Sequence, residues 1–177
     1  MVCTFIGNRD APNTILPELH NVLEYLIQRC GADVFYVGNY GSFDQMVRRE
    51  LSSLKAIYPQ ICYYVALAYF PTELQVGQTQ DDYKDTVFFD ELLSVPKRFA
   101  IDRLNRHLIS ISQVVITYVA HPGNATKYRD YALNTGKRII ELCRKDKESL
   151  NIGSCYDEKA KNVSIYCYSQ KYTLDKH

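Results

Sequence analysis

Short apolar runs alternate with amphipathic segments along most of this chain, and this alternation restricts the possible fold more than any other feature. Five runs are expected to be strands, at residues 2–7, 32–38, 60–70, 113–120 and 137–143. Four segments with apolar residues at helical spacing lie between these strands, one in each interval. They are residues 13–31, 42–59, 97–112 and 124–136. Strands that alternate with helices pair in parallel and carry helices on both faces of the sheet. We therefore predict an α/β fold, a Rossmann-like three-layer arrangement with a mainly parallel sheet of five or more strands.

The length of 177 residues suits one domain with a sizeable core. We expect residues 1–143 to form this domain. Residues 144–177 are expected to be a C-terminal extension that packs on the same domain or on a partner subunit. The alternating stretch VSIYCYSQKY within the extension is typical of an edge strand or a dimer contact. The polar segment 72–96 has weak periodicity and is expected to be a long loop or flap with a short helical piece.

The charge balance argues against a general affinity for nucleic acid or an anionic membrane. Lys and Arg number 21 against 20 Asp and Glu, a formal net charge of +1, so DNA is not an expected partner. A local basic patch from Lys97, Arg98, Arg103 and Arg106 is the alternative that would favour DNA. No apolar run is long enough to cross a bilayer, and we expect a cytoplasmic protein without a membrane partner.

The six cysteines are widely separated and include no C-x-x-C pair. No histidine stands at metal-ligand spacing from them, so neither a metal site nor a cofactor is predicted. Cysteine in apolar surroundings behaves as a small hydrophobic residue, and free buried thiols are the expected state.

Three loops are predicted to meet at one edge of the sheet, outside the carboxyl ends of the strands, where parallel α/β sheets bind ligands. Each loop contains glycine and opens into a helix, whose first N–H groups and dipole favour a phosphate. A single glycine after a strand is usually only a turn former, but three such loops at one edge favour a phosphate or nucleotide pocket. Neither G-x-G-x-x-G nor a Walker motif is present. The three loops are Gly7–Asp10, Gly38–Asp44 and His121–Thr126.

Individual side chains in these loops have two interpretations each. Arg9 suits a bidentate phosphate contact, or a salt bridge to Asp10 or Asp44. Asp44 suits a helix cap or a contact with a ribose hydroxyl. Tyr40 could stack on a base, and His121 suits a general base, a phosphate contact or a structural role.

The sequence resembles the SLOG superfamily, the Rossmann-like group that contains DprA/SMF proteins, LOG phosphoribohydrolases and YpsA/YspA-like proteins. It is most similar to a group of small bacterial proteins from Firmicutes. The resemblance covers most of residues 1–142 and implies a nucleotide-binding pocket and a homo-oligomer paired through helices. The matching pieces are CTFIGNRD, DVFYVGNYGSFD, YVALAYFP, VPKRFAIDRLNRHLI and VVITYVAHPGNATKY.

The departures from the family pattern concern catalysis. In LOG enzymes the last loop is P-G-G-x-G-T-x-x-E, whose glutamate helps to cleave an N-glycosidic bond. Here Gly123 matches, Asn124 replaces the second glycine, and Asp130 falls at the place of the glutamate after a one-residue shift. Asparagine tolerates the left-handed conformation that such a loop requires. Asn8 replaces the usual histidine of the first loop.

We therefore expect non-catalytic binding of a nucleotide or nucleotide-derived signal, as a sensor or a sequestering protein such as those of bacterial antiviral systems. The alternative is an enzyme, a LOG-like nucleoside 5′-monophosphate phosphoribohydrolase with Asp130 as the candidate catalytic residue. Arg98 and Asn105 join the ligand-binding set through the resemblance alone, since they fall in the PKRFA...RN stretch of the family. The expected ligand-binding residues are Gly7, Asn8, Arg9, Gly38, Asn39, Tyr40, Gly41, Asp44, Arg98, Asn105, His121, Gly123, Asn124, Ala125 and Thr126.

Overall fold

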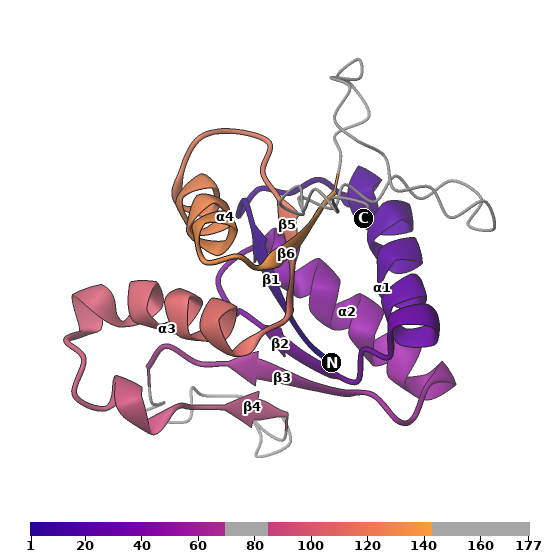
Figure 1. The fold of residues 1–177 in the computed structure, drawn as a ribbon, viewed down its shortest axis with the longest axis horizontal. Coiled ribbons are helices and arrows are strands. Elements are labelled where there is room, and N and C mark those ends of the chain that lie inside the picture. The colour runs from indigo at the N-terminus through magenta and orange to yellow at the C-terminus, as the bar shows by residue number, and fades with distance from the viewer. Residues whose placement is uncertain (70–84, 143–177) are drawn as a thin grey trace, which may run out of the picture.

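The computed structural model describes residues 1–69 and 85–142, and within them the chain forms a three-layer α/β fold (Figure 1). The strands are β1 (Val2–Gly7), β2 (Val34–Val37), β3 (Cys62–Ala66), β4 (Thr86–Val87), β5 (Val114–Tyr118) and β6 (Arg138–Glu141). The helices are α1 (Leu16–Cys30), α2 (Ser42–Ile57), α3 (Lys97–Ile111) and α4 (Asn124–Asn134), with short 3-10 turns at Asn13–Ile15 and Asp90–Leu92.

The six described strands form one sheet in the order β4-β3-β2-β1-β5-β6, and all neighbours are parallel. The predicted Rossmann-like fold with a parallel sheet is therefore confirmed. The direction of strand order reverses at β1, which has β2 on one side and β5 on the other. Gly7 at the end of β1 pairs with Tyr118 at the end of β5, so the loops that leave these two strands start at the same level.

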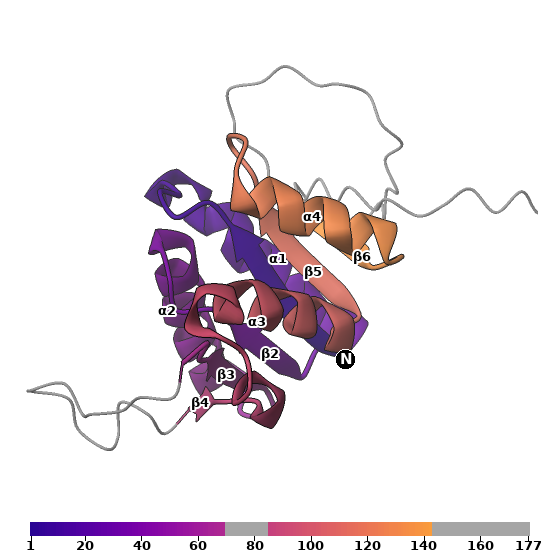
Figure 2. The same cartoon turned by 90° about the vertical axis from the view of Figure 1, so that its left-hand side faces the viewer.

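Apolar side chains on both faces of the sheet hold the layers together. Helices α1 and α2 pack on one face, and α3 and α4 cover the other (Figure 2). The strand β5 is buried at every position, as expected for a central strand covered on both faces. Each helix directs one stripe toward the sheet; in α4 the buried residues are Ala125, Tyr128 and Ala132.

Two features of the third strand differ from the prediction. The strand ends at Ala66 rather than at residue 70, because Ala68 and Tyr69 leave the sheet and join the cluster over α3. Cys62 is exposed at the start of β3, so the expectation of buried thiols is wrong for this residue, whereas Cys3 is buried and Cys30 is half-buried. The other three cysteines lie outside the described residues.

The predicted flap 72–96 is described only from residue 85 onward. It contributes the two-residue strand β4, which pairs with Val65 and Ala66, and the 3-10 turn Asp90–Leu92. The predicted C-terminal extension 144–177 lies outside the described residues.

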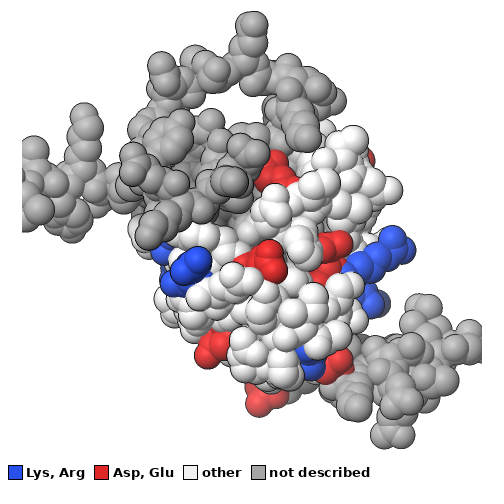
Figure 3. Space-filling view, turned by 90° about the vertical axis from the view of Figure 1, so that its right-hand side faces the viewer, with Lys and Arg blue, Asp and Glu red and all other residues white. Residues whose placement is uncertain are grey.

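The outer surface shows mixed charge. On the face covered by α1 and α2, basic and acidic side chains are dispersed among uncharged ones (Figure 3). None of the described helices is both long enough and apolar enough to span a membrane.

The end of β1 depends on a close approach between backbone and ring. A Cβ atom at Gly7 would lie 2.2 Å from Cδ1 of Phe43, and the Phe43 ring in turn stacks on Tyr118, with centroids 6.2 Å apart. Glycine at position 7 thus allows α2 to pack directly beneath the first loop.

We predict that Gly7→Ala lowers the free energy of unfolding by about 1–3 kcal/mol, the usual cost of overpacking a core. Urea unfolding of the wild type, Gly7→Ala, Phe43→Leu and the double variant measures this. The cost of Gly7→Ala should be smaller in the Phe43→Leu background, because leucine has no ring at the position of the clash. Equal costs in both backgrounds would contradict the contact.

Candidate functional site

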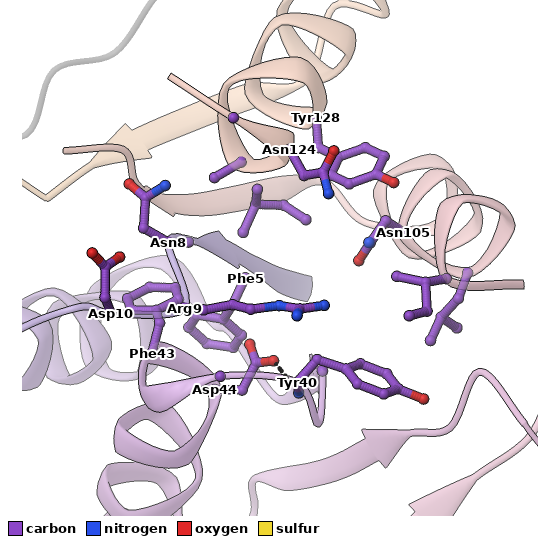
Figure 4. Close-up of a pocket in the computed structure, with 18 of the residues that line it drawn as sticks. Phe5, Asn8, Arg9, Asp10, Tyr40, Phe43, Asp44, Asn105, Asn124 and Tyr128 are labelled. Carbon is purple, nitrogen blue, oxygen red and sulfur yellow. Dashed lines mark hydrogen bonds between the residues drawn. The ribbon is translucent and has the colours of Figure 1, made fainter. Parts of the chain in front are cut away.

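A cavity of about 470 Å³ opens at the carboxyl ends of β1, β2 and β5, within the size range of small-molecule sites. It lies where the strand order reverses, the place at which parallel α/β sheets bind ligands. Figure 4 shows its side chains, which come from β1, from the three predicted loops and from α3 and α4. The lining residues are Phe5, Ile6, Gly7, Asn8, Arg9, Asp10, Gly38, Tyr40, Gly41, Phe43, Asp44, Ile101, Leu104, Asn105, His121, Gly123, Asn124, Ala125 and Tyr128.

Asn8 ties the first loop to the third. It is 5% exposed, and its Oδ1 accepts hydrogen bonds from the backbone N–H groups of Ala120 at 2.7 Å and His121 at 3.4 Å. Its Nδ2 donates to the carbonyl oxygen of His121 at 3.4 Å. The backbone N–H of Asn8 donates to the carbonyl oxygen of Tyr118 at 3.0 Å. The Asn8 amide therefore joins the ends of β1 and β5.

The second loop packs against the first through Gly41 and Ser42. A Cβ atom at Gly41 would lie 2.8 Å from Cα of Arg9, so the two backbones are in contact. The carbonyl oxygen of Arg9 accepts hydrogen bonds from the Ser42 N–H at 2.8 Å and the Ser42 hydroxyl at 2.5 Å. These contacts fix the backbone of Arg9, and its side chain extends across the cavity (Figure 4).

The two carboxylates considered as partners of Arg9 are engaged elsewhere. Asp10 pairs with His121, whose Nε2 lies 2.9 Å from Oδ1 of the carboxylate. Both side chains are more than half exposed, at 71% for Asp10 and 52% for His121, so they form the rim of the cavity. Asp44 accepts a hydrogen bond from the backbone N–H of Tyr40 at 2.9 Å.

Asp44 is an acidic group of the cavity with a shifted pKa. Burial raises the pKa of its carboxyl, and this effect exceeds the lowering by the Tyr40 N–H and by the charges of Arg48 and Arg9. The carboxylate fits beside Gly38, where a Cβ atom would lie 2.7 Å from Oδ2 of Asp44. Asp44 therefore caps its own loop, and its ionised form is poorly solvated next to the cavity.

The N-terminus of α4 forms the third side of the site. Gly123 is the N-cap residue, and no side chain caps the helix. A Cβ atom at Gly123 would meet no atom within 4 Å, so this backbone faces open space. Asn124 is the first residue of α4 and is helical, so it does not adopt the left-handed conformation considered from the sequence. First-turn N–H groups of a helix are not used by the helix itself.

Helices α3 and α4 supply the remaining wall. Ile101 and Leu104 of α3 are apolar, and Asn105 follows them on the same helix. Tyr128 of α4 is 6% exposed, and its hydroxyl donates to Oδ1 of Asp102 at 3.1 Å. Of these four lining residues, only Asn105 was predicted from the sequence.

Four predicted site residues do not line the cavity. Asn39 accepts a hydrogen bond from Arg48 at 2.8 Å, and the hydroxyl of Thr126 donates to the carbonyl of His121 at 3.4 Å.

The other two belong to α3 and α4. The guanidinium of Arg98 lies over the ring of Phe99, 4.6 Å from its centroid. The carboxylate of Asp130 pairs with Arg129 at 2.9 Å. Asp130 lies two residues beyond Tyr128, about 200° around the helix, so a helix that directs Tyr128 inward directs Asp130 outward.

Seven lining residues were missed as site residues: Phe5, Ile6, Asp10, Phe43, Ile101, Leu104 and Tyr128. Of these, Tyr128 carried a usable signal, because Ala125, Tyr128 and Ala132 form the apolar stripe of α4. The N-terminal end of that stripe meets the strand ends.

Comparisons with known proteins give no functional assignment. No model of a known protein family matches the chain, and no curated protein shows significant similarity to it. Function is therefore inferred from the cavity itself.

We predict that Asp44→Asn melts at a higher temperature than the wild type at pH 7–8, because asparagine avoids the desolvated charge. A carboxyl with a raised pKa in the folded state binds its proton more tightly there than in the unfolded chain. The stability that the protonated carboxyl contributes is therefore fully present below the ordinary pKa of an aspartate and is lost as pH rises through the raised folded-state pKa. The difference in Tm should narrow as pH falls toward the ordinary range of a carboxyl.

Thermal melts of both proteins between pH 5 and pH 8 measure this difference. Asp90→Asn, at an exposed site, is the matched control and should show no such pH dependence. A lower Tm for Asp44→Asn at pH 8 would contradict the role of burial.

Proposed function

We propose that this protein binds a nucleotide or a nucleotide-derived signal in the cavity, and senses or sequesters it without turnover. The observation that carries the proposal is the Arg9 side chain, which extends into the cavity from a fixed backbone and faces the wall that contains α4 (Figure 4). Membership of the SLOG superfamily is part of the same proposal.

The strand-end side of the cavity suits a phosphate. A guanidinium forms strong bidentate hydrogen bonds with phosphate oxygens. Ser42 holds the backbone carbonyl of Arg9 and not its side chain, so the guanidinium is available for such a contact. The uncapped start of α4 offers N–H groups and the positive end of the helix dipole. Gly123 lets a ligand approach this backbone closely.

The α3 side of the cavity suits a planar ring. Ile101, Leu104 and Phe5 present apolar surface, and Tyr128 adds an aromatic ring with a polar edge. Small-molecule sites commonly combine such apolar walls with a few polar groups that fix orientation. A nucleotide has this division between a charged phosphate and a flat base.

Two observations support binding over catalysis. Asp130, the candidate catalytic residue, pairs with Arg129 outside the cavity lining. His121 faces oxygen acceptors with both ring nitrogens, at 2.9 Å to Asp10 and 3.2 Å to the carbonyl of Pro122. Both ring nitrogens of His121 are therefore engaged by neighbouring protein groups at the rim.

We predict that Arg9→Gln weakens nucleotide binding at least tenfold, because it removes the charged phosphate contact. Isothermal titration of the wild type against mono-, di- and cyclic nucleotides and ADP-ribose derivatives identifies a ligand, and the variant is then titrated with it. Arg103→Gln is the matched control, since Arg103 is an exposed arginine of α3 outside the lining. A folded wild type that binds no member of the panel would refute the proposal.

A nucleotide N-glycosidase is the second candidate, and Asp44 is the observation that favours it. A half-buried carboxyl whose pKa is raised by desolvation in a cavity is a candidate general acid for a departing base. The family-derived alternative placed this chemistry on Asp130, which the cavity does not include.

We predict that the wild type releases no more free base from nucleoside 5′-monophosphates than Asp44→Asn or Asp130→Asn does. Chromatography of overnight reactions with each monophosphate measures the release. Base release that is lost in Asp44→Asn and kept in Asp130→Asn would establish the enzyme, with Asp44 as its acid.

A further inference from the structure

A short chain of hydrogen bonds at the α3 wall determines which way the Asn105 amide points. Its fixed end is Asp102, which contacts Lys127, Arg106 and Tyr128. The hydrogen bond with Lys127 is the main cause that lowers the pKa of Asp102, so the carboxyl is ionised at neutral pH. An ionised carboxylate only accepts hydrogen bonds.

The Tyr128 hydroxyl therefore donates its proton to Asp102, at 3.1 Å. A hydroxyl has one proton, so the same oxygen can only accept from any further partner. That partner is the Asn105 side chain: burial raises the pKa of the Tyr128 phenol, and the hydrogen bond with Asn105 opposes this rise. Lowering of a phenol pKa is the effect of an N–H donor, which stabilises the phenolate.

The amide nitrogen of Asn105 is thus directed to Tyr128, and its carbonyl oxygen is left for the cavity. Asn105 lines the cavity, and Figure 4 shows it between the Tyr128 hydroxyl and the Arg9 guanidinium, with its oxygen on the side of Arg9. The positions of the oxygen and nitrogen of an amide are assigned from its hydrogen-bond network. Here the network starts at the Asp102 carboxylate, which can only accept hydrogen bonds.

We propose that Asn105 is the specificity-determining residue of the cavity, and that its carbonyl oxygen selects a heteroaromatic ring that carries an amino group. This inference rests on the proposed binding of a nucleotide and adds the class of base. Ile101 and Leu104 lie on the same wall, where little water would replace a missing hydrogen bond. A ring without a donor would leave the Asn105 oxygen unpaired in the complex, which lowers affinity.

The test uses three pairs of nucleoside 5′-monophosphates that differ by one amino group. They are those of adenine and purine, of guanine and hypoxanthine, and of cytosine and 2-pyrimidinone. Titration calorimetry of the full chain gives the ratio of dissociation constants within each pair. We expect the amino member to bind roughly tenfold more tightly in the pair whose ring fits, the usual effect of one hydrogen bond.

Two variants test the roles of Tyr128 and Asn105 in this chain of hydrogen bonds. Tyr128→Phe removes the acceptor for the Asn105 amide nitrogen, so the amide can turn over, and the ratio should fall toward one while binding persists. Asn105→Ala should also bring the ratio toward one. Tyr131→Phe is the matched control: it removes a hydroxyl from the same helix outside the lining, where Tyr131 stacks with Arg106, and it should keep the wild-type ratio. Thermal melts confirm that each variant is folded.

The outcomes distinguish this inference from the proposed function. Equal affinities within every pair that binds, or a preference for the member without the amino group, would overturn the role of Asn105 and leave nucleotide binding in place. A wild-type ratio that persists in Asn105→Ala would do the same. Failure of all six compounds and of the wider nucleotide panel to bind the folded wild type would refute both.

Discussion

Parallel pairing of β1 with two different neighbours is the constraint on which the site depends. Because β2 and β5 flank β1 and run in the same direction, three loops leave the sheet at one edge. Parallel pairing alone would leave these loops free to diverge. The Asn8 amide joins the first loop to the third, and Gly41 with Ser42 joins the first to the second. The cavity is the space that remains between three loops held in this way.

Sequence patterns were sufficient for the elements and for most of the site. Buried parallel strands are continuous apolar runs, and each helix shows one apolar stripe, so both signals are local. The convergence of the loops follows from parallel pairing. The strand β4 could not be predicted in the same way, because it has two residues in a polar segment, and only the edge of β3 makes it a strand.

The predicted residues that do not line the cavity are separated from those that do by the orientation of their side chains. Motif alignment placed the catalytic candidate at Asp130, whereas the packing of α4 on the sheet directs Tyr128 inward. Asn39 stands among predicted loop residues but bonds to Arg48 of α2. A motif gives positions along the chain, and the direction of each side chain is set by the packing of its element.

The contact between Ser42 and the Arg9 carbonyl connects the cavity to helix α2. Ser42 is the first residue of the sixteen-residue helix α2. It donates two hydrogen bonds to the backbone carbonyl of Arg9, the residue whose guanidinium lies in the cavity. The backbone of Arg9 and the start of α2 are therefore held together at one point. Because α2 lies on the opposite face of the sheet from α3 and α4, the residue whose side chain crosses the cavity is anchored to the layer behind the sheet.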